Sequence, residues 1–446
     1  MDLKRNIAIT MAGRLSSMGF RLLSSIILAR GLGPDGRGLF ALMFLVPDLA
    51  ITLGRLGFDQ ANAIYAGLDR TGRRALLWHS VLLALGVGAV TWMLGVGFLA
   101  IGAPGLTALT TIPYWLYVLP LSLVPLKVLI DYWLALLRGM NQIVLLNLVE
   151  TSVRIGSLLL TAVLVWGLGL HVIGALWADI ILQAAAVVCI VWLFLRIDLW
   201  GKPAIDRALW KKAMRFALPA HAGTIAAYLN YRVDGFFIAA FLSREELGFY
   251  VIAAAIVERL WFLSGTVGTV LLPHLTHTPR RDPKLAAVVA RHVAIWVGVG
   301  CLVVFVVADF FVELLYSSAF APVVTPMRWL LPGIFTLSVG KVLVAEVLAR
   351  EKPGYTVWAS GVAAVVNIIG NFALVPPMGL AGSAIASSIS YTVLSGMLTW
   401  FYLRETGVSW MELIPRPSDF SLYVRLCSRS AWTVRLQKGT SRESAT

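Results

Sequence analysis

Two arginines share one helical stripe near the start of this sequence, inside an apolar run. Arg14 and Arg21 are seven residues apart, with Ser17 and Ser24 on the same face of a helix. No acidic residue lies near them in the sequence. Guanidinium groups donate paired hydrogen bonds to phosphate oxygens. The stripe therefore indicates an anionic ligand that carries phosphate.

Further basic residues lie within apolar runs of the second half of the chain. A charged side chain at the centre of a membrane helix costs about 2.5–3.5 kcal/mol, so such residues face one another or a water-filled cavity. We predict a cationic central cavity from this pattern. Its predicted substrate-binding residues are Arg14, Arg21, Arg232, Arg259 and Lys341.

Acidic residues at the same depth suggest energy coupling. Asp48, Asp179 and Glu258 are candidates to bind a coupling cation or a proton. The sequence contains no phosphate-binding loop of the Gly-x-x-x-x-Gly-Lys-Ser/Thr type, no His-Glu-x-x-His and no Gly-x-Ser-x-Gly. It therefore predicts no cofactor, no metal site and no catalytic residues, and the protein is not expected to be an enzyme.

Other intramembrane charges have a partner on their own helix. Lys127 and Asp131 are four residues apart, as are Glu150 and Arg154, which places each pair on one helix face. The spacing favours ion pairs that neutralise themselves. We expect these four residues to have a structural role.

The elements that position these charges are membrane helices. Of the 446 residues, 59% are hydrophobic and 13% are charged, and the mean hydropathy is +0.82; a soluble domain has about 25% charged residues. Several runs exceed the ~18 apolar residues that cross a hydrocarbon core. We predict an all-α integral membrane protein with about twelve transmembrane helices, at residues 6–29, 37–58, 76–101, 112–137, 146–167, 172–195, 213–241, 247–271, 292–315, 326–348, 354–375 and 381–403.

The net charge of +14 is a topology signal. With these helices, 25 of the 37 Lys and Arg residues fall on the side of the N-terminus. Four are assigned to the opposite loops: Arg30, Arg37, Arg244 and Arg328. Basic loops stay in the cytoplasm, so both termini are predicted to be cytoplasmic. The basic surplus therefore predicts no nucleic-acid partner.

The two halves of the chain are similar to each other. At an offset of 210 positions Gly38 meets Gly248, and Asp48 meets Glu258. Each half has an even number of predicted helices, which gives two six-helix bundles as parallel repeats. The predicted domains are an N-terminal bundle at 1–195, a cytoplasmic linker at 196–212, a C-terminal bundle at 213–403, and a basic cytoplasmic tail at 404–446 that is expected to be disordered.

Five segments together resemble the polysaccharide-transporter branch of the MOP superfamily, which contains the Wzx-type oligosaccharide flippases. They are Ile-Leu-Ala-Arg-Gly-Leu-Gly-Pro-Asp-Gly-Arg-Gly-Leu-Phe-Ala-Leu (27–42), Leu-Gly-Phe-Tyr-Val-Ile-Ala (247–253), Val-Leu-Leu-Pro-His-Leu (270–275), Val-Leu-Ala-Arg-Glu-Lys-Pro (347–353) and Gly-Leu-Ala-Gly-Ser-Ala-Ile-Ala-Ser-Ser-Ile-Ser-Tyr (379–391). The resemblance covers about residues 5–403. It implies a two-lobed, MATE-like transporter of the inner membrane that works by alternating access.

The resemblance also implies a substrate and partners. The substrate would be an undecaprenyl-pyrophosphate-linked oligosaccharide repeat unit, moved from the cytoplasmic to the periplasmic leaflet for O-antigen or exopolysaccharide synthesis. The implied partners are membrane lipids, a polysaccharide polymerase and a chain-length regulator. Two alternatives stay open: a cation-coupled multidrug exporter of the same superfamily, and a membrane-embedded enzyme of cell-envelope synthesis.

Overall fold

The structure is a computed structural model that describes residues 3–103, 109, 112–277, 282–417 and 419. Every regular element among these residues is a helix. Nine helical segments of the described chain are long and apolar enough to cross a membrane. The predicted all-α membrane architecture is therefore confirmed.

Two of the nine segments bend back sharply at a glycine, so each crosses twice. Helix α1 (Leu3–Gly54) is broken at Gly33 (φ 68°, ψ 176°), and α13 (Pro353–Thr406) is broken at Gly379 (φ 57°, ψ −135°). A positive φ suits glycine because it has no Cβ. The helix pairs predicted on either side of these glycines are thus joined directly, without a separate loop.

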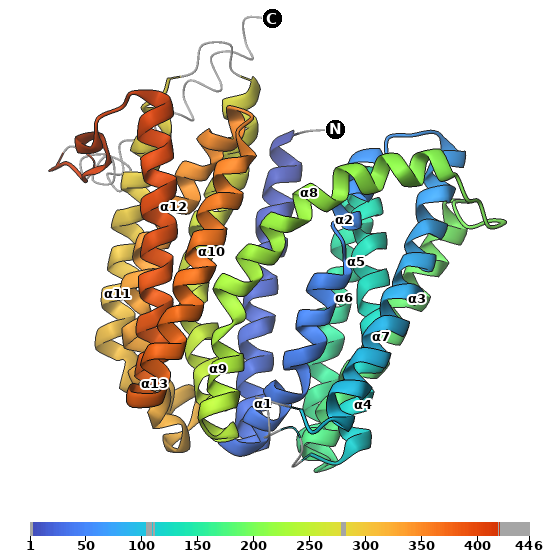
Figure 1. Cartoon of the computed structure of the whole chain (residues 1–446), viewed down its shortest axis with the longest axis horizontal. Coiled ribbons are helices and arrows are strands. Elements are labelled where there is room, and N and C mark those ends of the chain that lie inside the picture. Colours follow the sequence, from blue (N-terminus) through green and yellow to red (C-terminus); the bar gives the residue numbers. More distant parts are fainter. Residues whose placement is uncertain (1–2, 104–108, 110–111, 278–281, 418, 420–446) are drawn as a thin grey trace, which may run out of the picture.

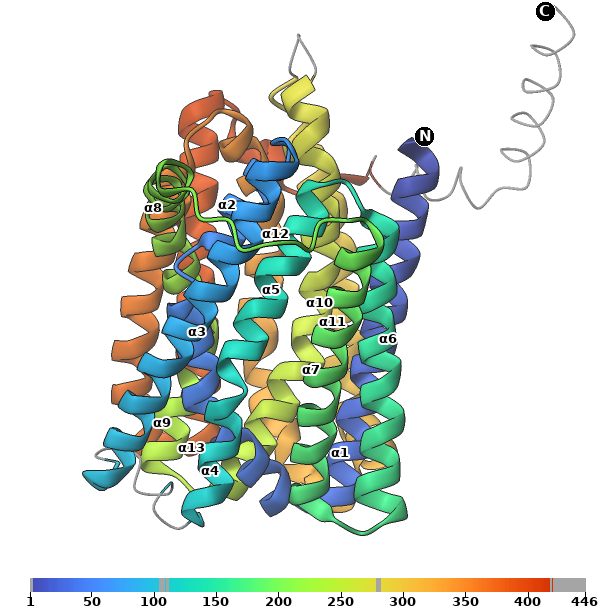
Figure 2. The same cartoon turned by 90° about the vertical axis from the view of Figure 1, so that its right-hand side faces the viewer.

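A further passage consists of α8 (Arg207–Arg232) and α9 (Asp234–Phe241). Helix α8 runs along the upper edge of the molecule and then descends to α9 (Figures 1 and 2). It begins within the predicted linker because the Asp206 carboxylate caps it, accepting hydrogen bonds from the amides of Ala208 (2.9 Å) and Leu209 (3.0 Å). With this passage, which is not among the nine apolar segments, the described helices provide twelve segments for the twelve predicted crossings.

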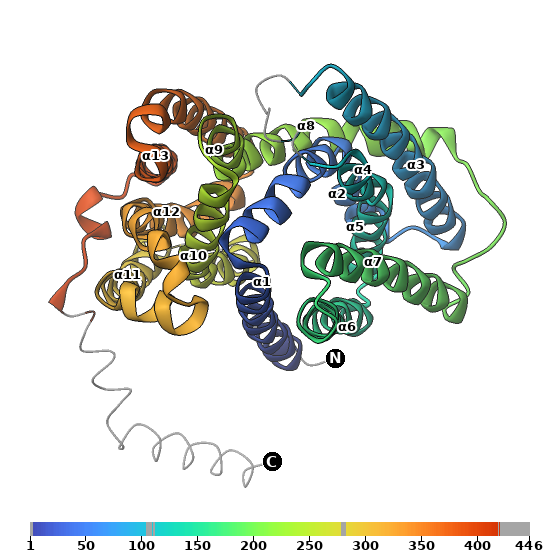
Figure 3. The same ribbon diagram turned by 90° about the horizontal axis from the view of Figure 1, so that it is seen from below.

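The remaining helices lie in two groups on either side of α1 (Figures 1 and 3). The first group comprises α2 (Phe58–Tyr65), α3 (Arg70–Ala100), α4 (Tyr114–Ser122), α5 (Val124–Gly139), α6 (Ile143–Thr161), the π-helical turn η2 (Ala162–Gly167) and α7 (His171–Arg196). The second group, which includes α9 and α13, also comprises α10 (Arg244–His277), α11 (Leu285–Tyr316), η3 (Ser318–Val323), α12 (Val324–Ala349) and η4 (Trp410–Leu413). We call the face where α1 begins the terminal face, and the face that carries Gly33 the far face.

Two hydrophobic cores hold these groups together. One lies within the first group and contains the buried rings of Phe58, Tyr132 and Trp133. The other fills the second group of helices and extends to Leu42 and Met43 of α1, which lies between the two groups. The two halves therefore share a core along the second segment of α1.

The segment that follows α13 packs against α11. Arg291 of α11 contacts the Asp419 carboxylate at 2.9 Å, and both side chains are more than nine-tenths buried. Glu412 of η4 lies 3.6 Å from the same guanidinium. The first part of the predicted tail is thus ordered on α11, and residues 420–446 lie outside the described residues.

Candidate functional site

A charged central cavity lies between the two groups of helices, in two chambers that share part of their lining. The large chamber has a volume of about 1090 Å³ and is bordered by α1, α5, α6, α8 and α10. The small chamber, of about 480 Å³, lies deeper, against the second segment of α1, α7 and α9. The residues that line both are Leu28, Arg37, Ser157, Arg232 and Val251.

Positive charge dominates the large chamber. Two glutamates face six arginines there, which leaves an excess of four positive charges. The charged lining residues are Arg21, Arg37, Arg138, Arg154, Arg232, Arg259, Glu150 and Glu258. Ser24, Asn147 and Thr151 add uncharged hydrogen-bonding groups to the same wall. The chamber is thus suited to an anion with a polar headgroup.

Both glutamates of the large chamber are already paired with arginines. Arg154 contacts Glu150 at 2.9 Å, as the four-residue spacing predicted. Arg232, which has no partner on its own helix, contacts Glu258 of α10 at 3.1 Å. The two acids therefore do not neutralise the other arginines of the chamber.

Three arginines of the large chamber take part in no ion pair within the described part of the chain, although the guanidinium of Arg37 lies 5.8 Å from the ring centre of Phe40. Among the described residues, no ion pair involves Arg21, Arg37 or Arg138. Arg259 donates only to the carbonyl of Ala255, one turn back on its own helix. These groups remain available to a bound anion.

The small chamber is electrically balanced. Lys127 contacts Asp179 at 2.9 Å, and its Nζ also lies 4.5 Å from the ring centre of Phe44. Asp48 is exposed in this chamber and takes part in no ion pair within the described chain. The charge of the Asp48 carboxylate is therefore not neutralised by an ion pair.

One predicted ion pair is wrong. Lys127 does not pair with Asp131, four residues away, since the Asp179 carboxylate of α7 approaches it more closely. Asp131 contacts Arg55 instead, at 3.3 Å. Asp179 thus pairs with a residue of another helix, and Asp131 pairs with a residue of the turn after α1, because tertiary packing brings opposite charges together more effectively than the helix spacing does.

The predicted binding residues do not all reach the cavity. Arg21, Arg232 and Arg259 line the large chamber. Lys341 packs on aromatic rings behind its wall, with Nζ 3.7 Å from the ring centre of Trp261. The side chain of Arg14 lies outside the described residues.

The predicted coupling residues fall in both chambers. Asp48 and Asp179 line the small chamber. Glu258 lies in the large chamber, where it is paired with Arg232. The structure therefore brings these three carboxylates to one cavity, and Asp48 alone among them stands without an ion pair in the described chain.

Sequence reasoning missed Arg37, which it assigned to an outer loop. Arg37 follows a Gly-Pro-Asp-Gly sequence that is typical of a turn. In the structure helix resumes at Pro34, directly after the break at Gly33, and Arg37 lines both chambers. Its Nε is buried without a hydrogen-bond partner. Pro34 could have indicated that a helix begins before Arg37, because proline is favoured in the first turn of a helix.

Asp234 is a second residue that the site prediction left out. It is 3% exposed and lies where α8 passes into α9. Tyr250 donates to its carboxylate at 2.6 Å, Ser387 at 2.7 Å and Asn371 at 3.1 Å. All these donors are neutral, and no ion pair involves Asp234 in the described chain. The four-residue spacing of Asn367 and Asn371 within an apolar run was the available signal.

The cavity is closed toward the far face. Arg244 of α10 contacts Asp35 of α1 at 2.5 Å, and Arg30 donates to the carbonyls of Leu314 (2.5 Å) and Leu315 (2.8 Å). Toward the terminal face the large chamber extends to Arg138, an exposed residue near the end of α5. Access is therefore from the terminal face.

A reciprocal glycine contact lies at the centre of this closure. A Cβ on Gly38 would stand 1.7 Å from the carbonyl oxygen of Arg244, and a Cβ on Gly248 would stand 2.6 Å from that of Pro34. The offset of 210 positions that relates the two halves converts one contact into the other. Glycine at both positions lets the backbones of α1 and α10 touch.

A family model described as "Polysaccharide biosynthesis protein" matches residues 3–278, more than half of the chain. No curated protein sequence matches the chain at a significant level.

Solved structures with the same fold include transporters of the MOP superfamily. An inward-facing MATE family multidrug transporter is similar over 88% of this chain and 95% of its own, with 14% identity and a TM-score of 0.68. The lipid II flippase MurJ in an inward closed conformation is similar over 91% and 89%, with 12% identity and a TM-score of 0.70. A MOP superfamily transporter from Pyrococcus furiosus, described as having a binding pocket of reverse polarity, is similar over 90% and 94%, with 16% identity and a TM-score of 0.56. These similarities confirm the predicted MATE-like fold.

Proposed function

The chain belongs to the polysaccharide biosynthesis protein family, and from this premise we propose that it is a flippase for lipid-linked oligosaccharides. The proposed substrate is an undecaprenyl-pyrophosphate-linked repeat unit of O-antigen or exopolysaccharide. One observation carries the proposal: the large chamber holds four positive charges in excess, inside a membrane protein. A diphosphate is the anionic part of such a substrate, and arginine forks match its oxygens.

The proposed binding mode assigns the diphosphate to the free arginines and the sugars to the rest of the chamber. Arg21, Arg154, Arg232 and Arg259 line the same chamber, so these positive charges act at one place. An anion among them lowers their mutual repulsion in a medium of low dielectric constant. Ser24 and Asn147 offer hydrogen bonds to sugar hydroxyls. Arg21 and Arg37 are the primary phosphate ligands in this proposal.

Alternating access then moves the headgroup. In the present conformation the cavity opens to the terminal face, which the charge distribution assigns to the cytoplasm. Opening of the contacts between α1 and α10 would expose the same arginines to the periplasm. The protein is thus proposed to be a multi-pass inner-membrane protein with both termini cytoplasmic.

Two carboxylates are proposed to couple transport to an ion gradient. Asp179 and Glu258 are less suited because each is held in an ion pair. Asp48 stands exposed in the small chamber without one, and Asp234 is buried among neutral donors. A carboxylate in such surroundings is stabilised by a proton or a cation. Asp48 and Asp234 are therefore the coupling candidates.

The cavity charge separates this function from its rivals. An exporter of cationic drugs would be hindered by four excess positive charges in its binding chamber. A biosynthetic enzyme would change the substrate chemically, whereas a flippase returns it unaltered on the other side. Direct measurement of the transported molecule thus distinguishes all three functions.

The proposal is tested by reconstitution. Purified protein in liposomes should move an undecaprenyl-pyrophosphate oligosaccharide to the opposite leaflet, read as protection from or exposure to an added glycosidase. Arg21→Ala should reduce transport about 10- to 150-fold, since a hydrogen bond to a charged group contributes ~1.5–3 kcal/mol. Arg21→Lys should restore transport only in part, because an ammonium group lacks the planar fork.

Arg328→Ala is the matched control. Arg328 also lies in a membrane helix and pairs with Asp309 at 2.6 Å, but it does not line either chamber. This variant should transport at the rate of the unchanged protein. Equal rates for Arg21→Ala and Arg328→Ala would refute the phosphate assignment, and chemical alteration of the lipid or export of cationic drugs in its place would refute the flippase function.

A further inference from the structure

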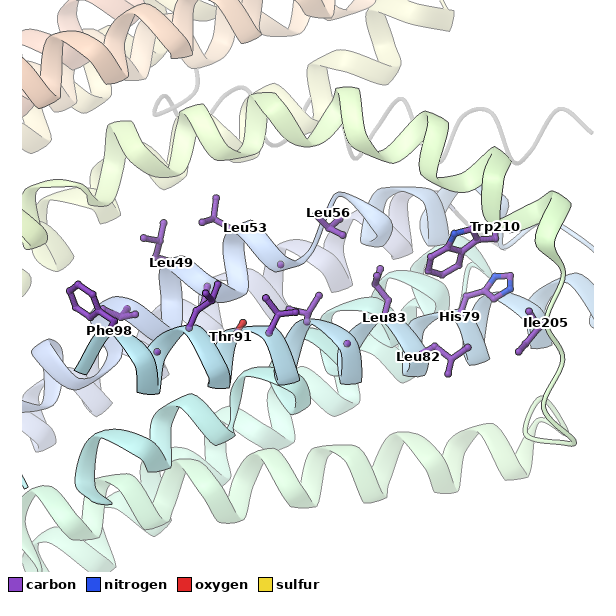
Figure 4. Close-up of a pocket in the computed structure, with 18 of the residues that line it drawn as sticks. Leu49, Leu53, Leu56, His79, Leu82, Leu83, Thr91, Phe98, Ile205 and Trp210 are labelled. Carbon is purple, nitrogen blue, oxygen red and sulfur yellow. The ribbon is translucent and has the colours of Figure 1, made fainter. Parts of the chain in front are cut away.

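A long apolar groove lies on the other side of α1 from the small chamber. It has a volume of about 1020 Å³ and is bordered by the second segment of α1, by α3 and by the beginning of α8 (Figure 4). Along α1, Phe44 and Asp48 face the small chamber, whereas Leu49 and Leu53 line the groove. The same helical segment thus separates the charged cavity from the groove.

The lining of the groove is suited to a hydrocarbon chain. Apart from His79, Thr91, Arg207 and Trp210, every residue that lines it is glycine or has a hydrocarbon side chain. His79 is already engaged, because its Nε2 accepts a hydrogen bond from the Asp206 amide at 3.3 Å. A polar ligand would find few partners here, whereas an apolar chain gains by contact with this wall.

The groove is longer than one leaflet of the bilayer. On α3 its lining runs from His79 to Phe98, which corresponds to about 28 Å at 1.5 Å per residue. The hydrocarbon core of a membrane is ~30 Å thick, so one leaflet provides ~15 Å. An acyl chain of a phospholipid stays within its own leaflet and would fill about half of the groove. A chain that fills all of it is a long one, such as a polyprenyl chain.

A positive charge marks the end of the groove near the terminal face. Arg207, in the first turn of α8, lines the groove and is exposed, and no ion pair involves it in the described chain. Lys211, one turn further along α8, is exposed as well. A phosphate at the membrane surface is attracted to such residues. Charge and apolar length together fit a long-chain lipid phosphate.

We propose that this groove binds the polyprenyl chain of the lipid-linked substrate, with the substrate's phosphate against Arg207. The inference rests on the proposed function and adds a second site to it. The His221 ring bonds to the Leu53 carbonyl at 3.2 Å and joins α8 to α1 between groove and cavity. The groove is therefore a loading site, occupied before the headgroup passes between these two helices into the central cavity.

Two glycines of α3 allow a matched test. A Cβ on Gly86 or on Gly97 would meet no atom within 4 Å, so a side chain can start at either position without a clash at its first atom. Gly86 lines the groove and Gly97 does not. Gly86→Phe should fill the groove, and Gly97→Phe should leave it open.

The measurement is binding of undecaprenyl phosphate, which carries no sugar, to the full-length protein in detergent by native mass spectrometry. We expect undecaprenyl phosphate to bind at least tenfold more tightly than farnesyl phosphate or phosphatidylglycerol. Gly86→Phe should remove this preference, Gly97→Phe should retain it, and Arg207→Ala should weaken binding of undecaprenyl phosphate several-fold. Equal binding of the three lipids, or an unchanged preference in Gly86→Phe, would overturn the inference.

The binding assay and the transport assay test the loading site and the flippase function separately, so that one proposal can be refuted without the other. Selective, Gly86-dependent binding without transport would leave the loading site standing and count against the flippase function. Transport at the full rate in Gly86→Phe would show that the groove is not on the substrate's path and would overturn the inference alone.

Discussion

Substitution of Gly38 should hold the far face of the protein open. The Cβ of Gly38→Ala would stand 1.7 Å from the Arg244 carbonyl oxygen, whereas real Cβ atoms essentially never approach within 3.0 Å. Helices α1 and α10 would have to separate by about 1.3 Å in the present conformation, and by nothing in a conformation where they are already apart. Overpacking of this kind costs about 1–3 kcal/mol. The equilibrium should therefore shift toward the open far face by about 5- to 150-fold.

The shift is measured as a distance distribution between two spin labels on the far face. Leu168, next to η2, and Ala319 of η3 are exposed and lie on opposite sides of α1; the native cysteines are replaced first. Gly38→Ala should populate a longer distance, while Gly97→Ala, which meets no atom within 4 Å, should not. Gly248→Ala should act in the same direction but less strongly, because its Cβ meets the Pro34 carbonyl oxygen at 2.6 Å.

The outcome that would refute this reasoning is a distance distribution in Gly38→Ala identical to that of the unchanged protein, with an unchanged melting temperature. Such a result would mean that the two helices absorb the extra methyl group without separating. Loss of folded protein is distinguished by the melting temperature and by the yield of labelled protein.

Two further predictions concern charges inside and outside the cavity. Arg232→Ala should lower the amount of folded protein by leaving Glu258 unpaired in the membrane, and the double variant with Glu258→Gln should restore the amount but not transport, as measured by gel filtration and the liposome assay. Acidification should release the segment after α13: burial raises the pKa of Asp419, but hydrogen bonds, including one from Arg291, outweigh it and hold that pKa below the usual 3.8. Because the pKa is lowered on folding, the contact stabilises above about pH 4 and is lost as the pH falls through the lowered pKa. Amide exchange of Trp410–Leu413 should thus rise as the pH falls below 3.8, and should already be raised at about pH 7 in Arg291→Ala.

The membrane architecture was predictable because its signal is spread over long segments. An apolar run of about twenty residues identifies a helix however its ends are drawn. The positions where helices begin and end depend on single residues. Asp206 caps α8 so that this helix begins within the expected linker, and the positive φ of Gly33 turns the chain where a loop was expected. A single capping residue or glycine gives only a weak signal in the sequence, although it determines where a helix begins or ends in the structure.

The cavity was predictable as a class of site, and less so residue by residue. A buried charge must find a partner or water, so a polar interior followed from the number of charged residues alone. Which partner each charge finds depends on how helices far apart in the sequence are rotated against one another. The spacing therefore gave the pair Glu150–Arg154 correctly, but it assigned Lys127 to Asp131 instead of Asp179.

The reciprocal glycine contact also bears on how such a chain can arise. When residue i of one unit touches residue j of another, and j touches i in return, the interface has the two-fold pattern of a symmetric homodimer. Two separate six-helix chains with this contact would close their far face as a dimer, and one connector on the terminal face would fuse them. Under the same offset Arg21 corresponds to Tyr231, and Arg37 to Leu247. Glycine thus stands at both positions of the closure, whereas the arginines assigned to the phosphate stand only in the first half of the chain.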